Sequence, residues 1–170
     1  MVDALGVDSC IACTRIAVDT LREFGVRAQP VAVQVNIHYA TAAAHITDGT
    51  PEAIADDPEA WTFQLGFGPF ELGDDIYNGH VVCVVEGRLL LDLTLGQANR
   101  PEHGVRLGPS VFGPLQADFL KGAGQVFSGA GGCVVAYQPH PAKRGYFALP
   151  HSTDRSFSRP FVSRIVTSLR

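Results

Sequence analysis

The chain has 170 residues, a length typical of one domain, which we expect to span residues 1–170. Hydrophobic residues make up 46%, enough for a sizeable core, and charged residues make up only 18%, against about 25% in an average soluble domain. The net charge of −4 gives no general reason to bind nucleic acid, and no apolar run is long enough to cross a membrane. Because no secretion signal is visible, we expect a soluble cytoplasmic protein.

A helix is predicted from Cys10 to Phe24. Its apolar residues recur at spacings of four, four and three positions, which places on one stripe Cys13, Ala17, Leu21 and Phe24. Asp8–Ser9 is typical of a helix N-cap, and Gly25 is typical of the residue that ends a helix.

Strands are predicted where apolar residues alternate or run together. Residues 30–39 are expected to form a half-buried strand, and residues 131–137 a further strand. Residues 80–85 and 88–94 are expected to pair as a hairpin around a tight turn at Glu86–Gly87.

The remaining segments are less regular. Residues 40–79 are expected to be irregular, residues 114–121 to form a short helix, and residues 161–169 to form an edge strand or a short helix. A helix followed by mostly antiparallel strands predicts an α+β domain, with the N-terminal helix packed on an antiparallel β-sheet.

Acidic and aromatic residues gather between Asp48 and Asp75, where eight acids occur without a base. A long connection of this kind is often functional. One interpretation is a lid that favours basic substrates, and the other, equally supported, is a solvated surface loop.

Basic residues concentrate at the other end of the chain. Residues 1–142 hold 16 acids and 7 bases, whereas residues 143–170 hold 6 bases and one acid. We favour packing of this basic segment on the acidic body over a weak anion-binding role, because no aromatic residues interleave as they do in base-stacking segments.

Three residues predict nucleophilic chemistry. Cys10 opens the first helix, where unpaired N–H groups and the helix dipole favour a thiolate. His80 opens the hairpin as a candidate base, and Asp92 lies in an otherwise apolar strand, where a carboxylate needs a partner. A two-residue turn at Glu86–Gly87 sets His80 opposite about residue 93, within one residue of Asp92.

The run Cys10-x14-Gly25-Val-Arg-Ala and the run from His80 through Asp92 to Thr94 together resemble transglutaminase-like domains, a branch of the papain-like cysteine enzymes. The order Cys, His, Asp agrees with that family. The resemblance covers residues 10–35 and 78–97. It implies a papain-like core and an amide substrate, peptide or protein, hydrolysed or transferred through a thioester on Cys10 by a Cys10–His80–Asp92 triad. No cofactor or metal is implied.

The sequence also offers candidate donors for the oxyanion and a second candidate function. The backbone N–H of Cys10 and the side chain of Gln34 or Asn36 are candidate donors for the oxyanion. The fold alone, acting as a catalytically inactive binding or interaction protein, is the alternative function.

The second cysteine of the Cys10-x-x-Cys13 pair leaves other interpretations. The pair is either redox-active or, with His80 and Cys83, half of a zinc site, although residues three apart on a strand point to opposite faces. Cys13 lies on the apolar stripe, so Cys10 is the favoured nucleophile. The plain structural interpretation is that these residues, with Cys83 and Cys133, belong to the core.

Overall fold

The computed structural model describes residues 9–39, 41–66, 79–101, 106–128, 132–148 and 152–169. Its helices are α1 (Ser9–Glu23), α2 (Thr41–Thr47) and α3 (Arg155–Ser168), with short 3₁₀ turns at Pro51–Asp56, Leu95–Ala98, Phe119–Lys121 and Gly145–Ala148. Its strands are β1 (Ala28–Tyr39), β2 (Trp61–Leu65), β3 (His80–Val85), β4 (Leu89–Asp92), β5 (Val111–Pro114), β6 (Gln125–Ser128) and β7 (Val134–Pro139).

Helix α1 ends as its sequence predicts. Gly25 adopts a left-handed conformation with φ of 73° and donates its N–H to the carbonyl of Arg22. Val26 donates to the carbonyl of Leu21, which completes a two-bond motif typical of helix C-termini. The chain then turns directly into β1. The expected cap at Asp8 lies outside the described residues.

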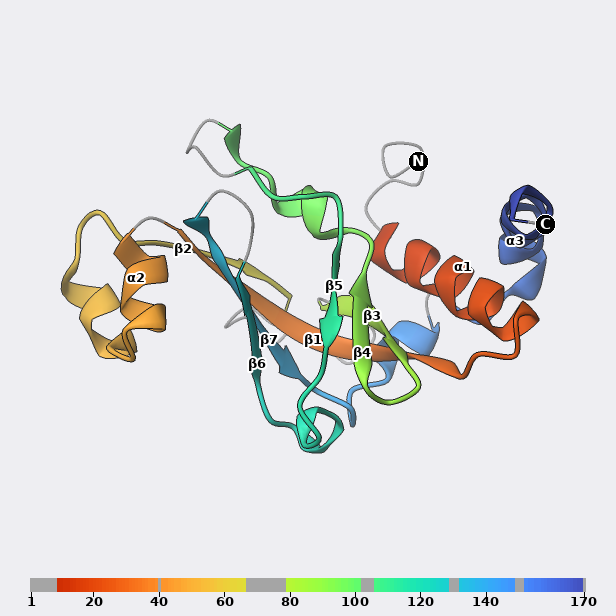
Figure 1. Cartoon of the computed structure of the whole chain (residues 1–170), viewed down its shortest axis with the longest axis horizontal. Coiled ribbons are helices and arrows are strands. Elements are labelled where there is room, and N and C mark those ends of the chain that lie inside the picture. The colour runs from red at the N-terminus through yellow and green to blue at the C-terminus, as the bar shows by residue number, and fades with distance from the viewer. Residues whose placement is uncertain are drawn as a thin grey trace.

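Strand β1 is the centre of an antiparallel sheet, and it crosses the whole molecule in Figure 1. The strand order is β5-β4-β3-β1-β7-β6, and β2 also pairs with β1. One edge of β1 pairs with β3 along residues 28–33 and with β2 along residues 35–39, while the other edge pairs with β7. The twelve residues of β1 are long enough to pair with all three neighbouring strands.

The sheet curls until its two outer strands meet. The ring of Phe127 on β6 lies so close to Gly113 on β5 that a Cβ added to that glycine would come within 2.5 Å of it. The backbone N–H of Gln116 also donates to the side chain of Gln125. The sheet is therefore nearly a barrel, and its interior is filled by Val, Ile, Leu, Phe and Tyr side chains from the strands and connections.

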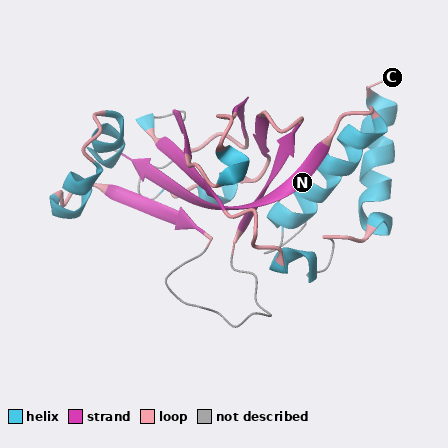
Figure 2. Ribbon diagram, turned by 90° about the horizontal axis from the view of Figure 1, so that it is seen from below, coloured by secondary structure: helices cyan, strands magenta, loops and turns pink. Residues whose placement is uncertain are grey.

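Helix α1 packs outside this sheet. Ala17 and Val18 contact Cys83 and Val85, while Val82 and Val84, which alternate with them, point into the interior. Figure 2 shows α3 beside α1 at one end of the sheet and α2 at the other end. The expected α+β architecture with the first helix on an antiparallel sheet is confirmed, and no helix among the described residues is long and apolar enough to cross a membrane.

Two of the predicted segments need correction. Residues 41–66 are not irregular, because they contain α2 and β2, and Phe63 and Leu65 of β2 pack against the interior. The segment 114–121 holds only one 3₁₀ turn at Phe119–Lys121, since its start belongs to β5.

Of the two structures predicted for residues 161–169, an edge strand or a short helix, the helix is correct, because most of this segment forms the second half of α3. The first half of α3 contains Pro160. The second half of the acidic segment, including Asp74 and Asp75, lies outside the described residues, so the lid stays a prediction.

Candidate active site

Cys10 lies in the first turn of α1, whose first residue is Ser9. The first four N–H groups of a helix have no partner within the helix, so the N-terminal turn favours negative charge. The Cys10 side chain is 8% exposed and packs with Ile11, Ala32, Val81 and Tyr146. The predicted nucleophile thus faces the junction of α1 with the β1–β3 pair.

The register of the β3–β4 hairpin brings His80 and Asp92 to one face. Val85 pairs with Leu89 and Cys83 with Leu91, so three residues, not two, separate the paired positions at the turn. Successive side chains on a strand alternate in direction, so a one-residue shift changes the face of every residue. With the predicted two-residue turn, Asp92 would align with Val81 and point away from His80. The observed register aligns it with Val82, on the face of His80.

The turn that sets this register is held by Arg27. Glu86 has φ of 52°, a left-handed conformation that is uncommon for a residue with a side chain. Its carboxylate accepts from the Arg27 backbone N–H at 2.7 Å and from the Arg27 guanidinium at 2.9 Å, and its own N–H donates to the Arg27 carbonyl. The backbone hydrogen bond is the main reason that the pKa of Glu86 is lowered.

His80 and Asp92 form a buried pair. Their Nε2 and Oδ2 atoms are 2.9 Å apart, and the two residues are 3% and 1% exposed. Burial lowers the pKa of His80, but the Asp92 charge, its hydrogen bond and a further hydrogen bond with the Cys10 side chain outweigh burial and raise the pKa to about 10. Since Nε2 faces Asp92, Nδ1 is the ring nitrogen left for the thiol. The structure therefore brings all three predicted residues together.

Asp92 is satisfied by more donors than the sequence suggested. Its Oδ1 accepts from the backbone N–H of Thr94 at 2.9 Å and from the Thr94 hydroxyl at 3.3 Å. Its Oδ2 also accepts from the hydroxyl of Tyr137 at 2.9 Å. Burial raises the pKa of Asp92, but His80 and these donors outweigh burial and hold the pKa below the usual 3.8. A buried carboxylate with this many donors stays ionised.

Tyr137, Thr94 and Thr14 are the positioning residues that sequence reasoning missed. Thr94 follows Asp92 at the spacing of a local side-chain turn, a signal visible in the sequence. Tyr137 comes from β7, 45 positions away, and reaches Asp92 across the barrel interior. The Thr14 hydroxyl donates to the carbonyl of Val81 at 2.9 Å and ties the helix of Cys10 to the strand of His80.

The backbone at His80 is crowded by a glycine. Gly66 follows β2 with φ of 77°, and a Cβ added there would lie 2.7 Å from the His80 nitrogen and 2.8 Å from the Gly79 Cα. Only glycine allows this approach, so the end of β2 defines the position of the first residue of β3.

The other cysteines lie where thiols are unreactive. Cys13 and Cys83 are each 1% exposed, and Cys133 is 3% exposed. Burial raises the pKa of Cys13 and of Cys133, and it raises the pKa of Cys83 to about 12. The structural interpretation of these three residues as core thiols is confirmed.

The zinc interpretation finds no support in the geometry. Cys83 packs against α1 on the outer face of β3, whereas His80 points to Asp92 on the other face. Within the described ranges, no group of three or more His, Cys, Asp or Glu side chains is arranged to hold a metal ion.

The candidate oxyanion donors lie on β1. Ala32 contacts Cys10, and Gln34 follows it on the same face of the strand. The Gln34 amide donates to the Asn36 side chain at 3.4 Å. Gln34 is thus the nearer of the two residues along the strand, and its role in binding an oxyanion stays a prediction.

Comparisons with protein-family models, with curated proteins and with solved structures found no match for this chain.

Proposed function

We propose that the chain is a cysteine-dependent amide hydrolase or acyltransferase that works through a thioester on Cys10. The observation that carries the proposal is the buried His80–Asp92 pair, 2.9 Å apart, in hydrogen-bond contact with a cysteine in the first turn of a helix. A nucleophile, a base and a group that orients the base are the parts that covalent acyl transfer needs. The substrate class is a peptide or protein amide.

In the proposed reaction, His80 holds the proton of Cys10, and the thiolate attacks the amide carbonyl carbon. The carbon–nitrogen bond then breaks, and the amine leaves with the proton from His80. Water or a second amine attacks the resulting thioester, gives a proton back to His80, and displaces the Cys10 thiolate. Asp92 keeps the imidazole oriented and stabilises its charged form throughout.

The fold is also compatible with the more specific proposal that the chain is a transglutaminase-like enzyme. A helix bearing the cysteine, followed by a curled antiparallel sheet bearing the histidine and the aspartate, is compatible with the papain-like core that the transglutaminase-like resemblance implies. We place the chain in that class as a proposal, on the chain order and geometry of Cys10, His80 and Asp92.

One observation favours the second candidate, a catalytically inactive fold that serves as a binding protein. Cys10 is only 8% exposed, and Tyr146 packs against it. An active enzyme requires that a substrate carbonyl reach the Cys10 sulfur, so the accessibility of this thiol separates the two candidates.

Thiol alkylation provides the test. The protein is treated with iodoacetamide at mildly acidic pH, and each cysteine is followed by peptide mass spectrometry. Cys10 should react faster than N-acetylcysteine under the same conditions, because the proposed mechanism requires His80 to take the proton of the thiol. His80→Ala should slow the reaction, whereas His45→Ala, on α2, should not. A Cys10 rate equal to that of N-acetylcysteine would favour the binding protein.

A further inference from the structure

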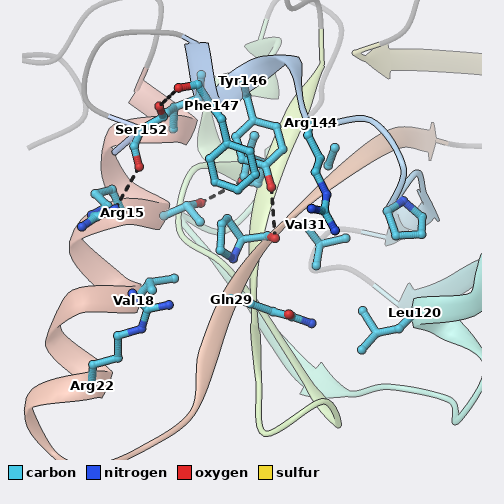
Figure 3. A pocket seen from close by; sticks show the side chains of 16 residues that line it. Arg15, Val18, Arg22, Gln29, Val31, Leu120, Arg144, Tyr146, Phe147 and Ser152 are labelled. Atoms are coloured by element: carbon cyan, nitrogen blue, oxygen red, sulfur yellow. Dashed lines mark hydrogen bonds between the residues drawn. The ribbon is translucent and has the colours of Figure 1, made fainter. Parts of the chain in front are cut away.

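A cavity of about 540 Å³ lies between α1, the first half of β1, residues 141–147 and Ser152. This volume is within the range of small-molecule sites. Figure 3 shows Arg15 and Arg22 on the α1 side of the cavity and Arg144 on the opposite side, beside the Tyr146 ring. The amide of Gln29 also lines it.

Hydrogen bonds fix the walls of this cavity. The Tyr146 hydroxyl donates to the Pro30 carbonyl at 3.2 Å, and a guanidinium N–H of Arg15 donates to the Ser152 carbonyl at 3.0 Å. Tyr146 is therefore attached to β1 and Ser152 to α1, and these hydrogen bonds hold the cavity walls in place.

The charge of the lining is one-sided. Among the described residues, its ionisable members include three arginines and no carboxylate. Arg15 and Arg22 share Asp19, which lies behind them on α1, at 2.6 Å and 3.8 Å. Arg144 forms no ion pair with any carboxylate in the described part of the chain. The cavity thus carries more positive charge than the described carboxylates neutralise.

Aromatic rings lie beside this charge. The rings of Tyr146 and Phe147 have centroids 4.5 Å apart, and both residues line the cavity. Guanidinium groups bind carboxylates and phosphates through paired N–H donors, and aromatic rings favour flat apolar groups. We propose that this cavity binds a small organic anion, a phosphate or carboxylate joined to a planar ring, with the anionic group at Arg144.

This site is separate from the triad, although the two are neighbours. Four residues that pack around Cys10 also line the cavity, and they are Ile11, Ala32, Val81 and Tyr146. Cys10, His80 and Asp92 themselves do not line it. Binding therefore does not depend on the proposed reaction, and the Cys10→Ser variant should bind as the unchanged protein does.

Phenyl phosphate is the probe for this proposal, with benzylamine as a ring of opposite charge. Titration of the ¹⁵N-labelled full chain should give saturable shifts at residues around Arg144 and Gln29 with phenyl phosphate and none with benzylamine. Arg144→Gln should weaken binding roughly tenfold, which is about 1.4 kcal/mol. Arg164→Gln makes the same charge change on an exposed residue of α3, outside the cavity, and should bind normally.

The contrary results are equally distinct. Equal weakening by Arg164→Gln and Arg144→Gln would mean that only net charge attracts the probe, and the proposal would fail. Shifts confined to α3, or no saturation at millimolar probe, would also overturn it. Weak binding of inorganic phosphate at the same residues would support the anionic half of the site, and the difference from phenyl phosphate would measure the contribution of the ring.

Discussion

The buried His80–Asp92 pair makes a specific prediction about stability and pH. The folded-state pKa of His80 is raised from 6.5 to about 10, mainly because Asp92 outweighs the effect of burial. A group with a raised folded-state pKa stabilises the fold fully below its unfolded pKa, and this contribution is lost as the pH rises toward the folded value. From pH 6 to pH 8 the unfolded chain releases this proton while the folded protein keeps it. The free energy of unfolding should therefore fall by about 2 kcal/mol from this residue.

Asp92→Asn should reverse the sign of that dependence. Without the carboxylate, burial is the largest influence on His80 and only the smaller effects of Cys10 oppose it. The pKa of His80 should then fall below 6.5, and the stability of the variant should rise slightly between pH 6 and pH 8. Breaking a buried pair costs about 3–5 kcal/mol, and this deficit should be largest at pH 6. His38 and His140, whose pKa values are lowered by burial, remain in both proteins and cancel in the comparison.

The assay is urea denaturation followed by circular dichroism at pH 6, 7 and 8. Asp118→Asn removes an exposed carboxylate that pairs only with Lys121 among the described residues, and it should follow the unchanged protein. If Asp92→Asn lost stability with rising pH as steeply as the Asp118→Asn control, His80 would not be held charged by Asp92, and the reasoning would be refuted.

Other substitutions test the groups that position the site. Tyr137→Phe removes a donor to the buried carboxylate and should lower the free energy of unfolding, measured in urea, by about 1.5–3 kcal/mol, the value of a hydrogen bond to a charged group. Gly66→Ala places a Cβ 2.7 Å from the backbone of His80, so it should lower Tm more than Gly49→Ala, which has a similar φ of 74° and no atom within 4 Å. Thr14→Val loses a hydrogen bond to β3 and should slow alkylation of Cys10, whereas Thr47→Val, which loses only a hydrogen bond within α2, should leave the rate unchanged.

Sequence patterns over a few residues predicted the helices and strands that depend on interactions between residues close in sequence. The end of α1 at Gly25 and the alternation of β1 are both visible over a few residues, and both are confirmed. Strands β2, β5 and β6 have only four or five residues each and were not predicted. Each is a strand because a neighbour supplies its backbone partners, and a pairing of that kind depends on the fold rather than on the segment.

The same distinction applies to the site. Cys10, His80 and Asp92 could be selected because each departs from its local surroundings, at a helix start, at a strand start or within an apolar strand. Tyr137 could not, because a tyrosine in an apolar strand is most simply a core residue. Its role depends on the curl of the sheet, which places β7 across the interior from β4.

The turn between β3 and β4 decides whether a site exists at all. A two-residue turn would leave Asp92 on the outer face, facing α1 rather than His80, and the buried carboxylate would lose its partner. The turn has three residues, and the contacts of Glu86 with Arg27 hold it in place. The third residue shifts the register by one position and moves Asp92 to the inner face. Those contacts lie on the surface at the far end of the hairpin from His80. Glu86 does not contact His80 or Asp92, yet it influences which residues face each other, because side chains alternate in direction along a strand. The predicted register was wrong by one position, and the extra turn residue places His80 and Asp92 on the same face.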